Sequence, residues 1–512
     1  MKRFLKISAL CLCMVLLLSC FAACSEGADN EVSFRSLKEN LGGTVRQTNK
    51  GAVMDSSSRT PSAAVTLPEA IDLNYRGIFC LTLENTSDAE KLIVDFVTEA
   101  DPNYTPFKRF ELPLEKTDGF QKLTVDVSAV YGWLGYLTGL KITAEGLSQG
   151  EITLKTLSVE EGGEGYIDGL KIENAQVYLT AKDRMNVKRI SFGPDGIVGS
   201  WRNDDGTINY IGSSSAGGVS GAFVSTGTPD DPFATMRYAG RRVNGVDWTE
   251  LGYCSIAQVV KEPTTGMLIG ITHLERHYDG SAYTATIGLS TSKDNGESWY
   301  FLGEFISHDI PVGEQLSVSR DIGNGTIYVD DEYLYIYIVD IRETDLAYGL
   351  AVCRVKLTEL YEKTLAGEMP QAYKYKDGQW NEPGWGGSFT NVLPQDVAPN
   401  FLYVTYNTKL QKYLMLICQS PYYQSNDGDI LLLASDSFTD WSNAQRQWIA
   451  TGFHGEQYPS IFSYEEDCQT ESGETFYLYW CDWNARDDSG VSDWQLLWAT
   501  AQYMCCKVTV TE

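Results

Sequence analysis

Short runs of alternating apolar and polar residues dominate the first third of the chain after residue 51. They include residues 77–83, 92–97, 123–127 and 151–157. A period of two places alternate side chains on opposite faces of an extended strand, and turn-forming residues separate the runs. Strands at this spacing predict a β-sandwich over residues 51–162.

The end of this segment has a loose resemblance to a known kind of module. Residues 131–142 and 150–152 resemble the closing strands of jelly-roll modules that are attached to carbohydrate enzymes. Two roles stay open for such a module: it binds glycan, or it spaces the next domain from a membrane.

The rest of the chain repeats one pattern five times. Each copy has a short apolar strand, a polar turn, a second aromatic strand and later a third strand. The second strands lie at residues 207–212, 267–272, 333–338, 413–417 and 476–480. An all-strand repeat of roughly 60 to 80 residues predicts propeller blades of four strands. We therefore expect an all-β chain in which a five-bladed β-propeller over residues 163–512 follows the sandwich.

One turn in this region has a specific sequence. Residues 292–299 have the form Ser-x-Asp-x-Gly-x-x-Trp, with Ser292, Asp294, Gly296 and Trp299 at the fixed positions. Asp and Gly favour a tight turn, and the Trp is expected to fold back as an apolar plug. The motif resembles the Asp-box hairpin of sialidases and other glycan-processing propellers, which is a scaffold element and carries no chemistry.

The N-terminus has the features of an export signal. A basic start precedes an apolar stretch over residues 7–18 that is too short to span a bilayer. The following Phe-Ala-Ala-Cys resembles a bacterial lipobox, which makes Cys24 the expected lipidation site and Cys20 the alternative. We expect a signal peptide over residues 1–24, a flexible tether over residues 25–50, and a protein anchored by lipid to the extracellular face of a bacterial cell membrane.

Charge and cysteine content exclude some functions. The formal net charge of −28 argues against nucleic-acid binding, which requires a basic surface. The cysteines after residue 24 are sparse and lack the spacing of zinc sites, so buried free thiols are expected, although export permits disulfides. We expect a monomer whose partner is an oligosaccharide or polysaccharide.

Propeller geometry indicates where chemistry could lie. In each blade the innermost strand starts, and the second strand ends, at the same face of the disc. Asp195 and residues 213–215 are the first blade's contribution there. The other blades supply a richer set of polar residues at these points: His273, Glu275, Arg320, Asp321, Arg342, Asp396, His454, Glu456 and Tyr458.

This set suits glycoside hydrolysis. That reaction needs one protonated carboxyl to assist the leaving group and one ionised carboxylate as base or nucleophile. Crowded carboxyls in a water-poor funnel acquire different pKa values, as this division requires. The arginines could grip substrate oxygens, and His273 with Glu275 could contact one sugar ring. In a chain this acidic, each single Asp also fits ordinary solvated surface, and the His–Glu pair also fits a structural role in a loop.

No cofactor is expected to be required, and no metal site is predicted. The sequence has no diagnostic metal-ligand spacing, nucleophile elbow, phosphate-binding loop or dinucleotide fingerprint. A structural Ca²⁺ ion stays open.

Residues 185–512 resemble five-bladed propeller glycosidases, the group that includes arabinofuranosidases, β-xylosidases and fructan hydrolases. Segments 287–294, 349–355, 435–441 and 458–461 carry the resemblance. It implies three carboxylates: Glu456 as general acid, Asp321 or Asp396 as the supporting Asp that sets its pKa, and a base on the first blade. The sequence departs from the family pattern at that base, because Asp195 lies in a Pro-Asp-Gly sequence typical of a plain turn.

The sequence thus predicts a surface-anchored glycoside hydrolase in which Glu456, Asp321 and Asp396 are catalytic. His273, Glu275, Arg320, Arg342, His454 and Tyr458 are the predicted substrate-binding residues. The missing base favours an alternative, a non-catalytic glycan-binding lipoprotein. A third interpretation is a propeller that docks other proteins.

Overall fold

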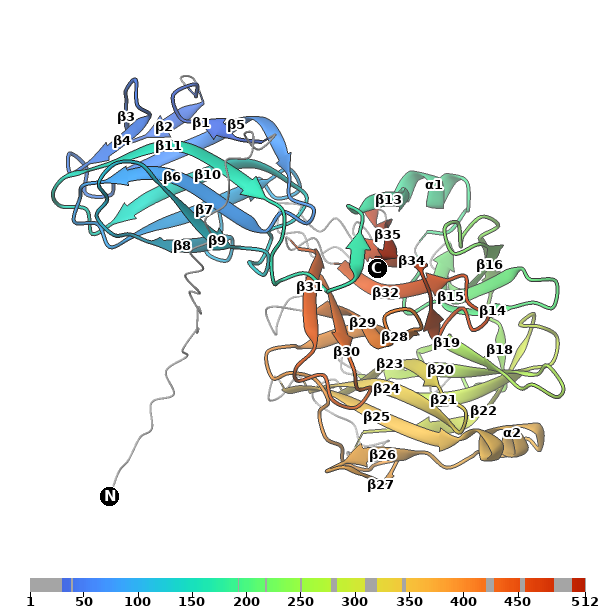
Figure 1. Ribbon diagram of the computed structural model, residues 1–512. Coiled ribbons are helices and arrows are strands. Elements are labelled where there is room, and N and C mark those ends of the chain that lie inside the picture. The colour runs from blue at the N-terminus through green and yellow to red at the C-terminus, as the bar shows by residue number, and fades with distance from the viewer. Residues whose placement is uncertain are drawn as a thin grey trace, which may run out of the picture.

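The computed structural model describes residues 30–37, 40–191, 193–216, 219–248, 251–277, 283–308, 320–342, 347–419, 428–451, 456–482 and 500–511. The predicted signal peptide, Cys20 and Cys24 lie outside these residues. Figure 1 shows a smaller N-terminal unit of strands beside a larger one. The predicted all-β class is confirmed, since the described residues contain only two short helices, α1 (Ala181–Asn186) and α2 (Leu357–Leu365).

The N-terminal unit consists of two antiparallel sheets. One has the order β3 (Arg46–Gln47), β4 (Ala52–Asp55), β11 (Glu151–Glu160), β6 (Ile78–Asn85) and β9 (Gln121–Asp126), with β1 (Val32–Ser33) also paired to β11. The other has the order β2 (Leu41–Gly43), β5 (Ser62–Asp72), β10 (Tyr136–Glu145), β7 (Lys91–Thr98) and β8 (Arg109–Pro113).

One hydrophobic core lies between these two sheets. Phe79, Phe96 and Phe110 surround Trp133, with ring centroids 4.9 to 6.4 Å from the indole. The alternation of buried and exposed residues along β8 follows the period-two pattern of its sequence. The sheets therefore pack face to face, as in a β-sandwich.

The flexible tether predicted for residues 25–50 is wrong for its described part. Strands β1, β2 and β3 pair within the two sheets, and Phe34 and Leu37 are 0% and 2% exposed in the shared core. The segment looked like a linker because its polar residues outnumber its apolar ones. The few apolar side chains it has are sufficient to dock it.

The larger unit contains five consecutive blades. Blade 1 has β14 (Gly199–Arg202), β15 (Ile208–Ala216), β16 (Val219–Gly227) and β17 (Arg237–Gly240). Blade 2 has β19 (Tyr253–Lys261), β20 (Leu268–His277), β21 (Tyr283–Ser292) and β22 (Trp299–Ile306), with β18 (Val243–Asn244) parallel to its edge.

Blade 3 has β23 (Arg320–Val329), β24 (Tyr333–Arg342), β25 (Ala347–Lys356), β26 (Tyr373–Lys376) and β27 (Gln379–Pro383). Blade 4 has β28 (Pro399–Asn407), β29 (Lys412–Gln419), β30 (Asp429–Ser435) and β31 (Gln445–Ala450), with β33 (Glu471–Ser472) beside β28. Blade 5 has β32 (Glu456–Ser463), β34 (Thr475–Asp482) and β35 (Gln502–Val510). All five predicted second strands lie in the second strand of a blade.

The outermost strands of blade 5 come from the start of the unit. Strands β12 (Leu170–Ile172) and β13 (Gln176–Leu179) both pair antiparallel with β35, near the end of the chain. Figure 1 shows β13 beside β35, although the bar places them at opposite ends of the unit's sequence. The repeat pattern did not reveal this pairing, because these strands precede the first repeat.

Five hydrophobic clusters lie between neighbouring blades. Trp299 and Ile211 belong to the cluster between blades 1 and 2, and Tyr210 and Phe462 to the cluster between blades 1 and 5. The remaining clusters join blade 2 to 3, 3 to 4, and 4 to 5. Five blades with five intervening cores form a closed ring, so the predicted five-bladed propeller is confirmed.

Side chains of the two units contact each other. The Tyr131 hydroxyl donates to Asp429 Oδ1 at 2.9 Å, and the Tyr131 ring packs edge-on against Trp448 at 5.5 Å. The N-terminal unit is therefore fixed against blade 4 of the propeller.

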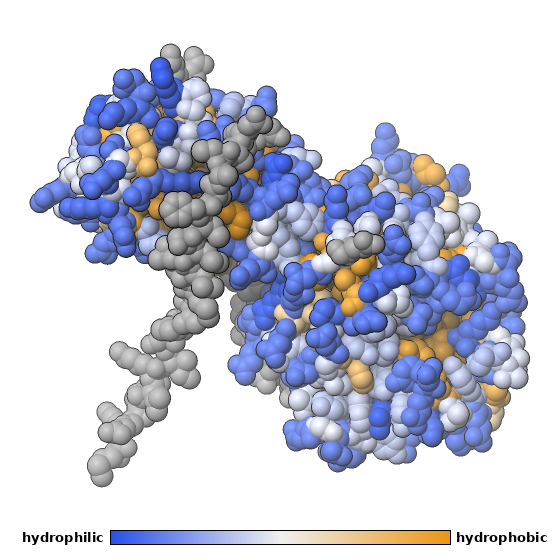
Figure 2. Space-filling view, in the orientation of Figure 1, coloured by the Kyte–Doolittle hydropathy of each residue, from blue (hydrophilic) through white to orange (hydrophobic). Residues whose placement is uncertain are grey.

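The face shown in Figure 2 is mostly hydrophilic, with smaller apolar areas between the polar ones. No helix within the described ranges is long and apolar enough to cross a membrane. The eight cysteines of the described residues are unbridged and most are buried, as expected from their strand-like surroundings.

Candidate functional site

One end of the propeller axis collects the starts of the innermost strands and the ends of the second strands; we call it the mouth. The register places Tyr253 opposite Glu275 in blade 2, Arg320 opposite Arg342 in blade 3, and Glu456 opposite Asp482 in blade 5. Blade 1 reaches the mouth through the segment before β14, where the Asp195 amide donates to the Ser213 carbonyl at 2.9 Å.

Five side chains from blades 1, 2 and 5 meet at the mouth, and we call them the Asp195 group: Asp195, Tyr253, His273, Glu275 and Tyr458. The Tyr458 hydroxyl donates to Asp195 Oδ1 at 3.0 Å. The Tyr253 hydroxyl donates to the backbone carbonyl of Asp195 at 2.7 Å. Two tyrosines from different blades therefore fix both the carboxyl and the backbone of Asp195.

The other two members come from β20. His273 Nε2 lies 3.1 Å from Glu275 Oε1, and both side chains are largely buried. The His273 ring packs edge-on against Tyr253, with centroids 5.8 Å apart. Alternate residues of a strand face the same side, so both side chains point to one side of β20; their contact with a sugar stays a prediction.

The Asp195 carboxyl has an altered proton affinity. Burial raises its pKa from 3.8 to about 6, because the protein desolvates the charged form. The hydrogen bond from Tyr458 lowers the pKa, the negative charge of Glu275 raises it, and His273 lowers it. Asp195 therefore changes charge in the pH range where a general acid or base is most effective.

Tyr458 adopts an unusual backbone conformation. Its φ is 57°, in the left-handed region that a bulky residue occupies at a cost on the order of 1 kcal/mol or more. The residue lies at a register shift in β32 between Gln457 and Ser460. This irregularity turns the Tyr458 side chain towards Asp195 while its ring stays packed on Phe401, 4.6 Å away. Local strain that positions a polar group is a common feature of functional sites.

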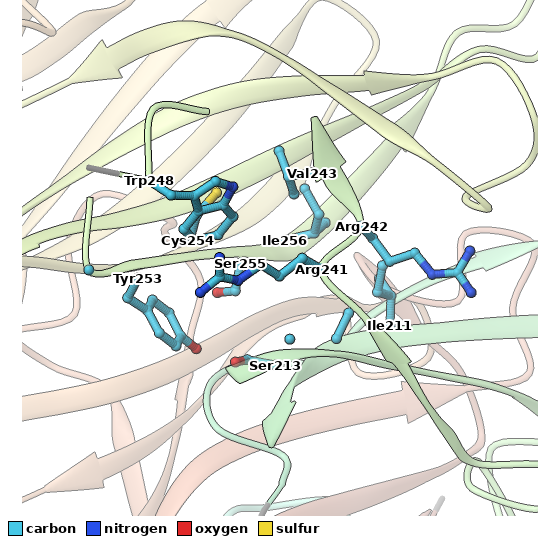
Figure 3. Close-up of a pocket in the computed structure, with 13 residues that line it drawn as sticks. Ile211, Ser213, Arg241, Arg242, Val243, Trp248, Tyr253, Cys254, Ser255 and Ile256 are labelled. Atoms are coloured by element: carbon cyan, nitrogen blue, oxygen red, sulfur yellow. The ribbon is translucent and has the colours of Figure 1, made fainter. Parts of the chain in front are cut away.

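A cleft of about 240 Å³ adjoins the Asp195 group between blades 1 and 2. Figure 3 shows its wall, which includes Tyr253, Ser255 and Ser213. The hydroxyls of Ser213 and Ser255 act to lower the pKa of Tyr253, whereas burial raises it well above its usual value. Tyr253 is thus shared by the Asp195 group and the cleft.

The structure brings the backbones of most predicted residues to the mouth. Asp321, Arg320 and Arg342 lie where β23 starts and β24 ends, and Glu456 begins β32, two residues before Tyr458. The placement of their side chains is outside what the structure describes. His454 lies outside the described residues altogether.

Asp396 does not join the Asp195 group. Its carboxylate is exposed and forms two hydrogen bonds, of 2.5 and 3.0 Å, with the guanidinium of Arg446 on β31, the outermost strand of blade 4. This hydrogen bonding with Arg446 lowers the Asp396 pKa. The segment before β28 passes along the outer part of the blade. Asp396 was predicted to lie at the mouth because it precedes β28 closely in the sequence, but that proximity does not fix where its side chain lies.

Sequence reasoning undervalued Asp195 and missed Tyr253. The Pro194-Asp195-Gly196 sequence is typical of a turn, and no local signal distinguishes it from a surface turn. Tyr253 is one of 30 tyrosines and has no motif around it. The one signal in the sequence that could have identified Tyr253 was the occurrence of aromatic residues at the starts of strands.

The turn at residues 292–299 supports the fold and is not part of this site. Asp294 Oδ1 accepts from the Ser292 hydroxyl at 2.8 Å and from the Ser298 amide at 2.9 Å. Gly296 has φ of 84°, and Trp299 is fully buried between blades 1 and 2. These contacts hold the β21–β22 hairpin; the assignment of the turn as an Asp-box stays a prediction.

No cluster of three or more His, Cys, Asp or Glu side chains suited to a metal ion occurs among the residues that the structure describes. Carboxyl, imidazole and phenol groups are the chemistry that the described mouth offers.

Comparison with known proteins gives distant likenesses only. No family model matches the chain, and no curated protein is significantly similar to it. A family 117 glycoside hydrolase from the marine bacterium Zobellia galactanivorans is 9% identical with a TM-score of 0.40, covering 67% of this chain and 90% of that one. A GH62 α-L-arabinofuranosidase from Coprinopsis cinerea is 13% identical (TM-score 0.37; 66% and 98% covered).

An α-L-arabinanase from Penicillium chrysogenum is 10% identical (TM-score 0.37; 66% and 99% covered). These proteins are of the kind that the sequence resembles. They are too distant to assign an activity, so the function proposed below rests on the residues of the mouth.

The raised pKa of Asp195 has a consequence for stability. Because the folded state disfavours the charged carboxylate, folding loses stability as pH rises from about 4 to about 6, and the full cost is present above that range. An elevation from 3.8 to about 6 corresponds to at most about 3 kcal/mol. We expect Asp195→Asn, which cannot ionise, to melt a few degrees above the natural protein at pH 7.5.

The expected gain shrinks at pH 5, where the folded natural protein is largely protonated. Thermal unfolding followed by circular dichroism at both pH values measures the difference in melting temperature between the variant and the natural protein. A variant that melts below the natural protein at pH 7.5 would contradict this account of the carboxyl.

Proposed function

We propose that this chain is a glycoside hydrolase that cleaves oligo- or polysaccharides at the mouth of the propeller. The observation that carries the proposal is Asp195. Its carboxyl lies at the first blade, where the sequence offered no clear base. Its pKa is about 6, and it is held by tyrosines from two other blades. Building such a group costs stability without an evident structural return, which is typical of functional sites.

Asp195 suits the role of general base or nucleophile. At neutral pH it is ionised, and a carboxylate with a pKa of about 6 is a stronger base than an ordinary Asp. The Tyr458 hydroxyl orients one carboxylate oxygen and leaves the other available to a water molecule or the sugar.

Glu456 is our proposed general acid. Its backbone lies two residues from Tyr458 and directly opposite Asp482 in the sheet. Asp321 is the proposed supporting carboxylate, from the start of β23. His273, Glu275 and the arginines at positions 320 and 342 are proposed to contact sugar hydroxyls. Asp396 is dropped from the proposed catalytic set, because Arg446 holds it on the outer part of blade 4.

The alternative of a purely glycan-binding protein loses the feature that favoured it. That interpretation depended on the lack of a first-blade base, and Asp195 is our proposed residue for that position. The N-terminal unit either binds glycan or acts as a spacer, and both roles are compatible with its fixed contact to blade 4.

Export and lipid anchoring remain part of the proposal. The basic start, the short apolar stretch and the Phe-Ala-Ala-Cys sequence support a monomer attached through Cys24 to the outer face of a bacterial membrane.

A screen of purified protein against a panel of glycosides tests the activity. We expect Asp195→Asn and Glu456→Gln each to lower kcat/KM at least a hundredfold, because each removes a group that acts on the reacting atoms. The matched control is Asp396→Asn, another predicted carboxylate, which should keep near-natural activity. Full activity in the Asp195 and Glu456 variants would overturn the assignment, as would the absence of cleavage of every glycoside in the panel.

The pH profile tests whether Asp195 acts in its ionised form, as a base or nucleophile, or in its protonated form, as an acid. As a base it must be ionised, so kcat/KM should rise with pH through about 6. Tyr458→Phe removes a hydrogen bond that lowers the Asp195 pKa, so this rise should move to higher pH. Tyr479→Phe, which loses a buried hydroxyl bonded to the Pro229 carbonyl instead, is the control and should leave the profile in place.

If kcat/KM of Tyr458→Phe rises over the same pH range as in the natural protein, then ionisation of Asp195 does not cause that rise. A rate that falls with pH through about 6 would identify Asp195 as the acid.

Lipidation is tested in bacteria that process lipoproteins. We expect labelled fatty acid to enter the natural protein and to be absent from Cys24→Ala, with Cys20→Ala labelled normally. Incorporation that depends on Cys20 instead would move the anchor to that residue.

A further inference from the structure

The cleft between blades 1 and 2 contains a cation that the proposed reaction does not use. Arg241, which follows β17, lies on its wall together with Trp248, and the guanidinium carbon is 4.3 Å from the centre of the indole ring. Figure 3 shows the Arg241 side chain reaching towards Ser255 and Tyr253, whereas the side chain of Arg242 points away.

The two neighbouring arginines have different partners. Arg242 pairs with Glu297 at 2.9 Å and donates from Nε to the Ala239 carbonyl at 3.0 Å, so it supports the protein's own structure. Arg241 has no carboxylate partner among the described residues. Its guanidinium stacks on the face of the Trp248 ring. Stacking on an indole fixes the plane of a guanidinium while leaving its N–H donors available.

Hydroxyl groups line the same cleft as this guanidinium. Ser213, Ser255 and Tyr253 lie on the wall beside Arg241, and Ile211, Val243 and Ile256 form its apolar part. A planar cation next to hydroxyls suits a carboxylate attached to a polar ring, because a guanidinium binds a carboxylate through two parallel hydrogen bonds. The cleft's roughly 240 Å³ is below the usual volume for drug-sized ligands and suits a single sugar unit.

The cleft and the Asp195 group share Tyr253. Its hydroxyl binds the Asp195 carbonyl, its ring contacts His273, and it also lines the cleft. A sugar unit in the cleft would therefore neighbour the unit at Asp195 in one bound oligosaccharide.

We propose that this cleft is a subsite for a uronic acid unit of the substrate, with Arg241 binding the sugar carboxylate and Ser213 and Ser255 near its hydroxyls. This inference rests on the proposed function for its link to a reaction, but the binding itself does not require cleavage. In a chain with a net charge of −28, attraction of an anionic sugar must come from a local cation, and Arg241 supplies it.

Binding of matched sugars to the full-length Asp195→Asn protein tests the subsite without turnover. The probes are methyl glucuronoside and methyl galacturonoside, each with its neutral counterpart, methyl glucoside and methyl galactoside. Titration followed by protein NMR or calorimetry gives Kd. We expect at least one uronoside to bind at least tenfold more tightly than its neutral counterpart, with affinity that falls as salt concentration rises.

Two arginine variants are compared in that background. Arg241→Gln should remove the tenfold preference while leaving binding of the neutral sugars unchanged. Arg237→Gln, which changes an exposed arginine on β17 that does not line the cleft, should keep the preference. Thermal unfolding of both variants checks that they are folded.

Equal binding of charged and neutral sugars, or an equal loss in both arginine variants, would overturn the subsite. So would a preference for a sulfated galactoside over both uronosides. Cleavage of glycosides by the natural protein, together with equal binding of charged and neutral sugars, would retain the proposed function and reject this inference. Uronoside binding without cleavage of any glycoside would retain the subsite and reject the proposed reaction.

Discussion

Closure of the propeller ring is the constraint on which the rest of the structure depends. Strands β12 and β13, from the start of the unit, pair with β35 at its end, so the fifth blade is completed by residues more than 300 positions away. The pairing removes an open sheet edge and brings blade 5 against blade 1. The contact between Tyr458 and Asp195 exists only because these two blades meet.

The two ends of the axis differ in how polar groups are used. Away from the mouth, Gln469 accepts from the amides of Ser200 and Val259 at 3.0 and 3.2 Å and donates to the Val259 carbonyl at 2.5 Å. The Ile327 amide likewise donates to Gln258 at 2.6 Å. These buried hydrogen bonds join neighbouring blades, which stabilises the ring.

At the mouth the polar groups serve no comparable purpose for the fold. Asp195 is desolvated enough to raise its pKa, Tyr458 is held at a positive φ, and Arg241 stacks on Trp248 beside an open cleft. In the turn at Ser292 to Trp299, by contrast, the Asp294 carboxylate is bonded by residues of the turn itself. The desolvated Asp195, the strained Tyr458 and the stacked Arg241 together locate the site on the molecule.

The sequence by itself determined the strands, because apolar and aromatic runs separated by turn residues are local properties of the chain. It also determined the number of blades, since each blade repeats one such pattern. The substrate-binding roles of His273 and Glu275 and the catalytic role of Glu456 stay predictions.

Only the tertiary structure decided that residues 32–47 pair within the two sheets of the N-terminal unit and that β13 closes the ring. It decided as well that Asp396 forms an ion pair with Arg446. It also decided that Asp195 is a buried carboxyl and not a surface turn. These facts depend on contacts between residues far apart in the chain, and neither spacing nor composition records which distant side chain will lie beside a given residue.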